Sequence, residues 1–335
     1  MQRQKIVLLL LVLSLWVVVA SAKASETPSQ AQIRQAVNRS LPLMQKSLVE
    51  YPHHATCFSC HHQGVALFAL ALARTRGYAV EEKSLTAVVQ HTAADLRSEL
   101  ANYQKGEGQP GGVTRAGYAL LALQSGGAKR DEITSAVTGF LLQREKEKGF
   151  WYTSSNRPPQ EASAFTDTFL AIRALKAYGE AAQQEIAKAR IEKARQWLEQ
   201  TPPKDTEDSV FRLWGLKEAG ATNAVLQKAT KALLEAQRED GGWAQLPTLK
   251  SDAYATGSVL TVLFLAGGLS PSSSAYQRGI QFLLQTQLPD GSWHVVSRSK
   301  PFQPYFESGF PYGKDQFISM AASGWATAAL ALSTP

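Results

Sequence analysis

The clearest candidate for chemistry is a cysteine and histidine cluster early in the chain. The sequence has two cysteines, Cys57 and Cys60, and His61 directly follows the second. In an exported chain, Cys-x-x-Cys-His is the attachment pattern of c-type haem. Two thiols one helical turn apart can bond both vinyl groups of a porphyrin, and the adjacent imidazole then lies under the iron. We therefore predict that Cys57 and Cys60 bind haem c covalently and that His61 is the metal ligand.

Other interpretations of this cluster stay open. A zinc ion could bind Cys57, Cys60 and His61. Its fourth ligand would come from a neighbouring histidine, namely His53, His54 or His62. The thiols could instead be structural, either as an inert disulfide or as two buried groups without a ligand. A haem protein that transfers electrons would also need a redox partner.

A second group of chemically competent side chains is acidic and lies near the middle of the chain. Asp205, Glu207 and Asp208 are close together, and packed carboxylates raise one another's pKa. A carboxylic acid that is kept neutral in this way can donate a proton, even to an alkene. We therefore take Glu207 and Asp208 as candidate catalytic acids. The isolated residues Asp167 and Asp252 are interpreted as helix caps.

The first residues have the pattern of a secretory signal. Arg3 and Lys5 precede an apolar run from Ile6 to Val19, and small residues follow at 20–22. This run is shorter than the roughly 20 residues needed to cross a bilayer. We expect residues 1–22 to be a cleaved signal peptide. Residues 23–335 should then form one domain, periplasmic or secreted, without a stable membrane span.

The composition is typical of a globular protein. Of the 335 residues, 44% are hydrophobic and 19% are charged, which is enough to bury a large core. The formal net charge of +7 is not gathered into a basic run. We therefore expect no nucleic acid partner.

Repeated helices must position these groups. Three segments have an amphipathic helix that ends in Gln, then a Gly-containing turn and an aromatic residue: 140–151, 233–243 and 282–293. A second kind of helix, apolar on nearly every face, follows each turn, and such a helix must be buried. These inner helices are expected at 64–73, 114–123, 165–175, 209–216, 254–265 and 321–332. Strand signals are scarce throughout.

The spacing of these segments predicts the fold. Six outer and inner helix pairs at intervals of roughly 40 to 55 residues are typical of helix-hairpin repeats. An open superhelix would leave one apolar face in water, so closure into a double ring is favoured. We predict an all-α protein, an α/α toroid of six helix-hairpin repeats. The Cys-x-x-Cys-His cluster should lie at the start of its first inner helix.

The turns at 237–243 and 287–293, Gln-Arg-Glu-Asp-Gly-Gly-Trp and Gln-Leu-Pro-Asp-Gly-Ser-Trp, resemble the QW repeats of squalene-hopene cyclases and their prenyltransferase relatives. The resemblance covers the chain from about residue 136 onward, strongly in these two repeats. It implies a toroid whose inner helices open at their amino ends on a cavity for isoprenoid substrates. Squalene-hopene cyclases protonate with an Asp-x-Asp-Asp motif, and Asp205-Thr-Glu207-Asp208 resembles it with Glu at the position of the acid. Those cyclases have two toroids, whereas this chain has residues for one.

Three functions are consistent with these features. The first is an exported toroid with haem at Cys57, Cys60 and His61, beside an apolar cavity for an isoprenoid-like or other hydrophobic ligand. The second is a terpene cyclase-like enzyme without haem, in which the cluster holds zinc or is structural. The third is a non-catalytic binding scaffold. The aromatic loop at 294–314 is expected either to cover the cavity or to pack at the ring closure. We expect Tyr254 and Trp325 to be core residues.

Overall fold

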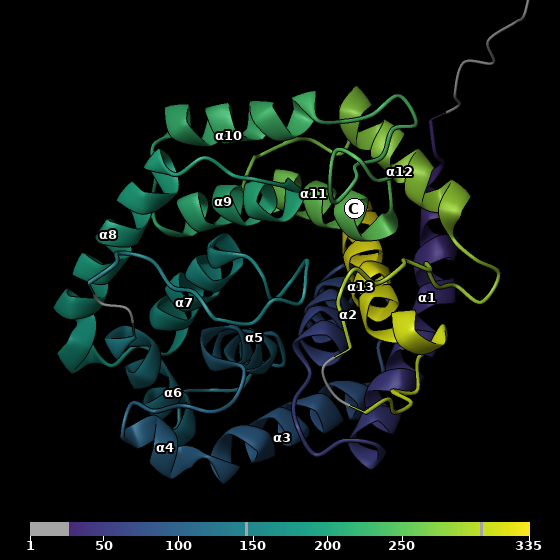
Figure 1. Cartoon of the computed structure of the whole chain (residues 1–335). Helices are drawn as coiled ribbons and strands as arrows, with labels where there is room; N and C mark the ends of the chain where they lie inside the picture. The colour runs from purple at the N-terminus through teal and green to yellow at the C-terminus, as the bar shows by residue number, and fades with distance from the viewer. Residues whose placement is uncertain (1–26, 145–146, 302–303) are drawn as a thin grey trace, which may run out of the picture.

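Helices of two kinds alternate along the chain and form two concentric rings (Figure 1). The computed structural model describes residues 27–144, 147–301 and 304–335, so the expected signal peptide at residues 1–22 lies outside the described residues. Over these ranges the β structure is limited to one isolated bridge, between Arg157 and Glu161. No helix in the same ranges is long and apolar enough to cross a membrane.

The inner ring is closed. Within the described residues it consists of α2 (Val65–Thr75), α5 (Gly112–Ser125), α7 (Ala164–Tyr178), α9 (Thr206–Glu218), α11 (Ala253–Leu265) and α13 (Gln316–Leu332). Each of these helices contacts the next, and α13 returns to contact α2. The predicted α/α toroid with six inner helices is therefore confirmed.

The outer ring surrounds the inner one. It consists of α1 (Gln30–Glu50), α3 (Glu82–Ser98), α4 (Leu100–Gln104), α6 (Glu132–Gln143), α8 (Gln184–Gln200), α10 (Asn223–Glu235) and α12 (Ser274–Thr286). The second outer element is divided into α3 and α4. Short turns complete the path, at η1 (Tyr51–His53), η2 (Cys60–Gly64), η3 (Ala181–Gln183) and η4 (Gly313–Asp315).

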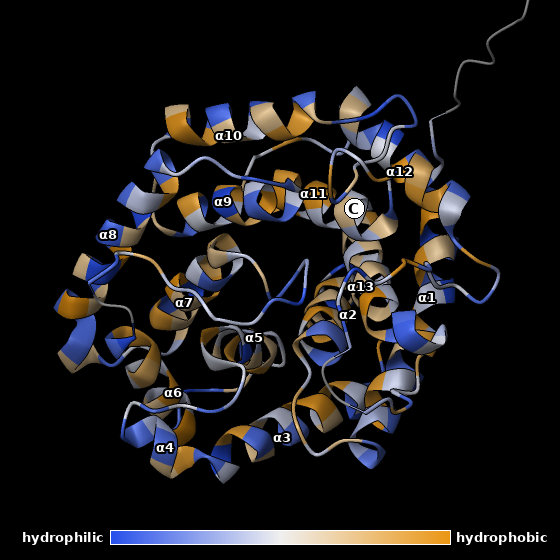
Figure 2. Ribbon diagram, viewed as in Figure 1, coloured by the Kyte–Doolittle hydropathy of each residue, from blue (hydrophilic) through white to orange (hydrophobic). Residues whose placement is uncertain are grey.

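Burial explains why the helices sort into two rings. In α10 the buried residues are Leu226, Ala229 and Leu233, which lie on one stripe at the helical period. In α11, by contrast, every residue from Ala253 to Leu263 is buried. Figure 2 shows the same contrast, with polar and apolar residues mixed along the outer helices and few polar residues on α11 and α13.

The repeated Gln and Trp side chains join neighbouring elements. Three indole N–H groups donate to carbonyl oxygens of the preceding outer helix: Trp151 to Leu141 at 2.6 Å, Trp243 to Leu233 at 2.7 Å and Trp293 to Leu283 at 2.9 Å. The Gln287 amide donates to the Gly291 carbonyl at 3.0 Å and to the Ala36 carbonyl at 2.8 Å. Because Ala36 belongs to α1, Gln287 links the last outer helix to the first.

Close packing between inner helices gives a test of this architecture. A Cβ added at Gly257 in α11 would lie 2.5 Å from the backbone nitrogen of Ala326 in α13. We expect Gly257→Ala to lower the free energy of unfolding by about 1–3 kcal/mol, because the backbone of α13 must shift. Urea unfolding followed by circular dichroism would measure the change.

Gly139 is the matched control, because it is also helical but a Cβ added there would meet no neighbouring atom within 4 Å. Gly139→Ala should raise the free energy of unfolding by up to about 1 kcal/mol through helix propensity. Equal effects of the two substitutions would contradict the close approach of α11 and α13.

Candidate functional site

Hydrogen bonds between inner helices gather around their amino ends. The Thr114 hydroxyl, at the start of α5, donates to Asp167 Oδ1 in the first turn of α7 at 2.6 Å. The Ser163 hydroxyl, at the N-cap of α7, donates to Asp208 Oδ1 in α9 at 2.7 Å. These contacts place the first turns of successive inner helices beside one another. The predicted acids therefore lie at one end of the ring, as expected.

Glu207 is the central acid of this end. Its side chain is buried. The Thr166 hydroxyl donates to Oε1 at 3.0 Å and the Tyr254 hydroxyl donates to Oε2 at 2.9 Å. Burial, together with the nearby charge of Asp205, raises the pKa of Glu207 from its ordinary 4.5 to about 8. The carboxyl group is therefore mostly neutral at pH 7.

Asp208 has a different environment from Glu207. Its Oδ1 accepts the Ser163 hydroxyl, and its Oδ2 accepts the backbone N–H of Lys204 at 3.0 Å. Asp205 is the N-cap of α9 and accepts the backbone N–H of Asp208 at 2.9 Å. The contacts of Asp208 thus hold the start of α9 against α7.

The capping interpretation holds for Asp252 and is wrong for Asp167. Asp252 is the N-cap of α11 and accepts the N–H of Ala255 at 2.9 Å. The N-cap of α7, however, is Ser163, and Asp167 lies within the first turn. Its carboxylate instead links α7 to α5 through Thr114. Burial and the nearby charge of Glu161 raise the pKa of Asp167 to about 7.

The cysteine and histidine cluster lies beside the same helix ends. Cys60 begins η2, directly before α2, and its Sγ is 3.9 Å from the Thr114 carbonyl oxygen. Cys60 is buried and Cys57 is half-buried, and both are free thiols. Burial raises the pKa of the Cys60 thiol well above its ordinary 9.0. The folded protein therefore holds Cys60 as an unreactive thiol.

His61 faces a carboxylate that sequence reasoning missed. Its Nδ1 is 3.1 Å from Glu161 Oε1, and Glu161 also pairs with Arg157. A carboxylate on one ring nitrogen is the usual way to orient a histidine that ligates a metal through the other. His61 therefore fits a ligand role through Nε2. Across residues 27–144, 147–301 and 304–335, however, no three His, Cys, Asp or Glu side chains are placed to hold a metal ion.

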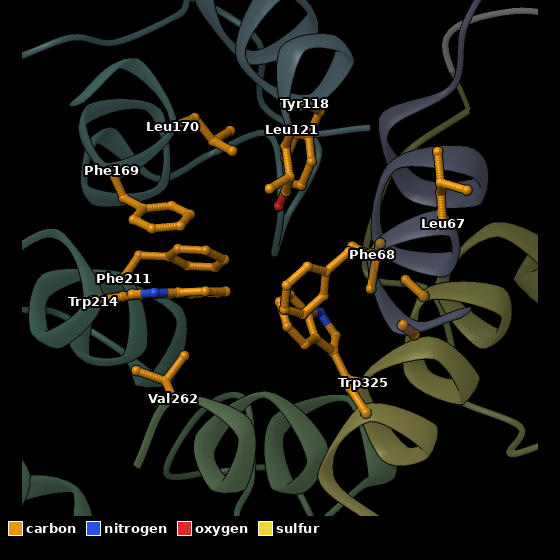
Figure 3. Packing of buried hydrophobic residues seen from close by; sticks show 14 of the residues in the cluster. Leu67, Phe68, Tyr118, Leu121, Phe169, Leu170, Phe211, Trp214, Val262 and Trp325 are labelled. Carbon is orange, nitrogen blue, oxygen red and sulfur yellow. The ribbon is translucent and has the colours of Figure 1, made fainter. Parts of the chain in front are cut away.

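Aromatic side chains fill the space enclosed by the inner ring (Figure 3). The Trp214 ring lies 4.3 Å from Phe169 and 5.6 Å from Phe68, measured between centroids. Trp325 lies 5.7 Å from Phe68 and 6.3 Å from Phe211. These five residues, Phe68, Phe169, Phe211, Trp214 and Trp325, are called the aromatic cluster below.

Two open clefts lie outside the aromatic cluster. One, of about 380 Å³, lies between α4 and α6. The other, of about 420 Å³, lies beside the segment 148–164 and is lined by Ser163 and Asp167. The second cleft thus reaches the helix ends where the acids lie.

The long loop between α12 and α13 also reaches this end of the ring. Arg298 Nε donates to Gln245 Oε1 at 2.8 Å, and the Ser299 hydroxyl donates to the Pro158 carbonyl at 3.0 Å. The loop also packs at the ring closure, where the Ser308 carbonyl oxygen accepts the Ser47 hydroxyl of α1 at 3.3 Å. Residues 294–314 therefore make contacts of both expected kinds. Residues 302–303 lie outside the described part of this loop.

Sequence reasoning missed several residues around Glu207. Tyr254 is buried, as a core residue should be, but it also donates to the acid. Thr166 donates to Glu207 and Tyr118 lies near it, although 41 and 89 residues separate them from it in the chain. Only the position of Tyr254, two residues after the capping Asp252, offered a local signal.

Comparison with known proteins agrees with this geometry. The family model of the squalene-hopene cyclase C-terminal domain matches residues 205–321, and the match therefore begins at Asp205. Lanosterol synthase of Candida albicans is 30% identical over 99 residues, which are 26% of this chain and 14% of that protein. The chain thus spans only a small part of this curated relative.

Solved structures share the fold over most of this chain. The type II terpene cyclase MstE from Scytonema has a TM-score of 0.56 at 15% identity, over 90% of this chain and 98% of that one. The ent-copalyl diphosphate synthase from Streptomyces platensis has a TM-score of 0.53 at 17% identity, over 80% of this chain and 50% of that one. Another MstE structure contains geranylgeranyl dihydroxybenzoate as substrate. The ring and the solved structures thus show an α/α toroid fold, and residues 205–321 are similar to the squalene-hopene cyclase C-terminal domain.

Proposed function

We propose that this protein is a terpene cyclase-like enzyme that protonates an isoprenoid or similar hydrophobic alkene, with Glu207 as the acid. The observation that carries the proposal is a carboxyl group that stays neutral while it is held in place by two hydroxyl groups. Thr166 and Tyr254 fix its two oxygens, so the acid has one orientation. Proton donation by a positioned side chain contributes roughly 10²–10⁴-fold to a rate.

The chemistry requires only protein groups and the substrate. The Glu207 O–H proton adds to one alkene carbon, the π electron pair forms the new C–H bond, and the neighbouring carbon becomes a cation. A second alkene supplies the π pair that closes a carbon–carbon bond. Loss of a proton to the Glu207 carboxylate or to solvent forms an alkene and ends the sequence. The aromatic cluster supports this proposal because ring faces attract cations.

The aromatic cluster also sets a condition on binding. Its rings contact one another, and neither of the two described clefts is lined by them. A hydrophobic ligand must therefore separate these rings as it enters. The cleft beside Ser163 and Asp167 lies at the helix ends and supports entry from that side.

Substitution of Glu207 tests the acid. We expect the full-length protein to convert squalene or a geranylgeranyl-substituted aromatic compound to a cyclised product, detected by mass spectrometry after chromatography. Glu207→Gln keeps the shape of the side chain but removes the proton, so the rate should fall by about 10²–10⁴-fold. Glu185→Gln, on the outer surface of α8, is the control and should keep the wild-type rate. Equal rates for the Glu207 variant and wild type would exclude Glu207 as the acid.

The free energy of unfolding should depend on pH through the Glu207 carboxyl group. Between about pH 4.5 and about pH 8 the folded protein holds a proton at Glu207 that the unfolded chain has released. The folded state therefore binds more protons, and the free energy of unfolding falls as pH rises. We expect Glu207→Gln to flatten this decline, measured by urea unfolding at several pH values from 5 to 8. Asp167 contributes in the same direction to both proteins, so their difference isolates Glu207. Parallel profiles would show that Glu207 is ionised in the folded state.

A second candidate function is covalent haem binding, and the His61 and Glu161 pair favours it. Cys57 and Cys60 would carry the thioether bonds, and His61 would ligate iron through Nε2. Bound haem would supply redox or ligand chemistry at this end of the ring, and electron transfer would require a redox partner. Because Cys60 is buried, attachment must precede folding of this segment. This proposal includes export of the chain through residues 1–22.

Absorption spectroscopy tests this candidate. The chain should be produced in a periplasm that contains haem maturation machinery. A Soret band that survives denaturation, and that disappears when Cys57→Ser and Cys60→Ser are combined, is the expected result. A colourless protein from the same cells would contradict haem attachment, and one equivalent of zinc in it would favour the metal alternative.

A further inference from the structure

Arg298, on the loop between α12 and α13, lies beside two acidic helix caps. Its Nε donates to Gln245 Oε1 at 2.8 Å, and the Gln245 amide in turn donates to Asp252 Oδ2 at 3.0 Å. Asp252 caps α11 and Asp205 caps α9. Burial raises the pKa of both caps, and the positive charge of Arg298 opposes this rise in each. The guanidinium is therefore close to the first turns of two neighbouring inner helices.

The same part of the loop is also bound to the other side of α9. The Ser299 hydroxyl donates to the Pro158 carbonyl at 3.0 Å. Pro158 belongs to the segment before α7, whereas Gln245 belongs to the segment before α11. In the inner ring α9 contacts both α7 and α11. Residues 294–299 thus join the two neighbours of the helix that carries Glu207.

We propose that residues 294–299 form a strap that closes the end of the ring over Glu207, with Arg298 as its latch. The latch is the contact that must break before the strap can open. This inference rests on the proposed function, because the strap would control the access of a hydrophobic ligand to the acid. Arg298 is a positioning residue here, since it acts through the strap.

The surroundings of the guanidinium suit a latch that opens reversibly. Among the described residues, the Arg298 Nη2 atom is buried and has no hydrogen-bond partner. The closed strap therefore leaves part of the bonding capacity of the guanidinium unused. Water would satisfy the same atom once the strap opens, which offsets part of the lost attraction to the acidic caps. The free energies of the closed and open states should therefore be similar.

The root of the strap is held separately from the latch. His294 Nε2 lies 2.9 Å from Asp315 Oδ2, and the Ser297 N–H donates to Asp315 Oδ1 at 2.9 Å. Asp315 directly precedes α13, so these contacts tie the root to the inner ring. Loss of the Arg298 contact should therefore open the strap without unfolding the rest of the protein.

Hydrogen exchange of the full chain, followed by mass spectrometry, tests the latch. Arg298→Gln removes the positive charge but keeps a polar side chain. We expect peptides that cover residues 294–301 to exchange at least about fivefold faster in this variant than in the wild type. Arg298→Lys keeps the charge and should restore most of the protection. Added salt should speed exchange in the wild type and leave Arg298→Gln unchanged, because ions screen a charge pair.

Lys300→Gln is the matched control. It removes the same charge from a nearby exposed position in the loop. Its strap should exchange at the wild-type rate. Equal exchange in Arg298→Gln and the wild type would overturn the latch. The latch would also be wrong if Arg298→Gln lowered the thermal stability of the whole protein while the strap kept its protection.

Ligand uptake separates the strap from the proposed function. Uptake of squalene by the full chain can be followed through the change in tryptophan fluorescence, and it should be several-fold faster in Arg298→Gln because an open strap exposes the helix ends. Faster exchange and uptake with no product from any isoprenoid would support the latch and refute the cyclase. Product formation that requires Glu207, with exchange and uptake unaffected by Arg298→Gln, would support the cyclase and refute the latch.

Discussion

The structure depends on one constraint, which is that the inner helices are too apolar to leave any face in water. In α11 and α13 almost every residue is buried, so each needs neighbours on all sides. A closed inner ring supplies neighbours along the circumference, and the outer ring covers the remaining faces. Closure also brings the first turns of the inner helices together at one end of the ring. The position of the candidate site is therefore a consequence of how apolar helices are buried.

Burial of these helix ends also determines the surroundings of their polar groups. Asp208 accepts the Ser163 hydroxyl and the Lys204 N–H, and Asp167 accepts the Thr114 hydroxyl. Glu207 receives two hydroxyl groups, while burial and a neighbouring aspartate keep its proton in place. Two acidic residues adjacent in sequence thus have different partners, because Asp208 links α9 to the N-cap of α7, whereas Glu207 links α9 to both α7 and α11.

The fold could be predicted from the sequence because local patterns distinguish inner from outer helices. These patterns are the period of the apolar residues and the Gln, Gly and Trp turns. Glu207 could be found because three acids lie within four positions. Asp167 was misinterpreted because the cap of α7 is Ser163, and cap position depends on where the helix begins. Glu161 and Tyr118 could not be found, since their contacts with His61 and Glu207 join segments about ninety or more positions apart along the chain. Haem and zinc are not part of the chain, so the sequence alone does not distinguish between them as the partner of the two thiols.

The seam of the ring, where α13 closes it against the first helix pair, has a consequence for synthesis of the chain. The first helix pair, α1 and α2, packs against α13, and Gln287 bonds to Ala36 across the same seam. A nascent chain therefore carries apolar surface on its first pair until the last helix has been made. Contacts between such distant segments slow the search for the native state. Until that moment the growing polypeptide would depend on chaperones or on delayed collapse to avoid aggregation.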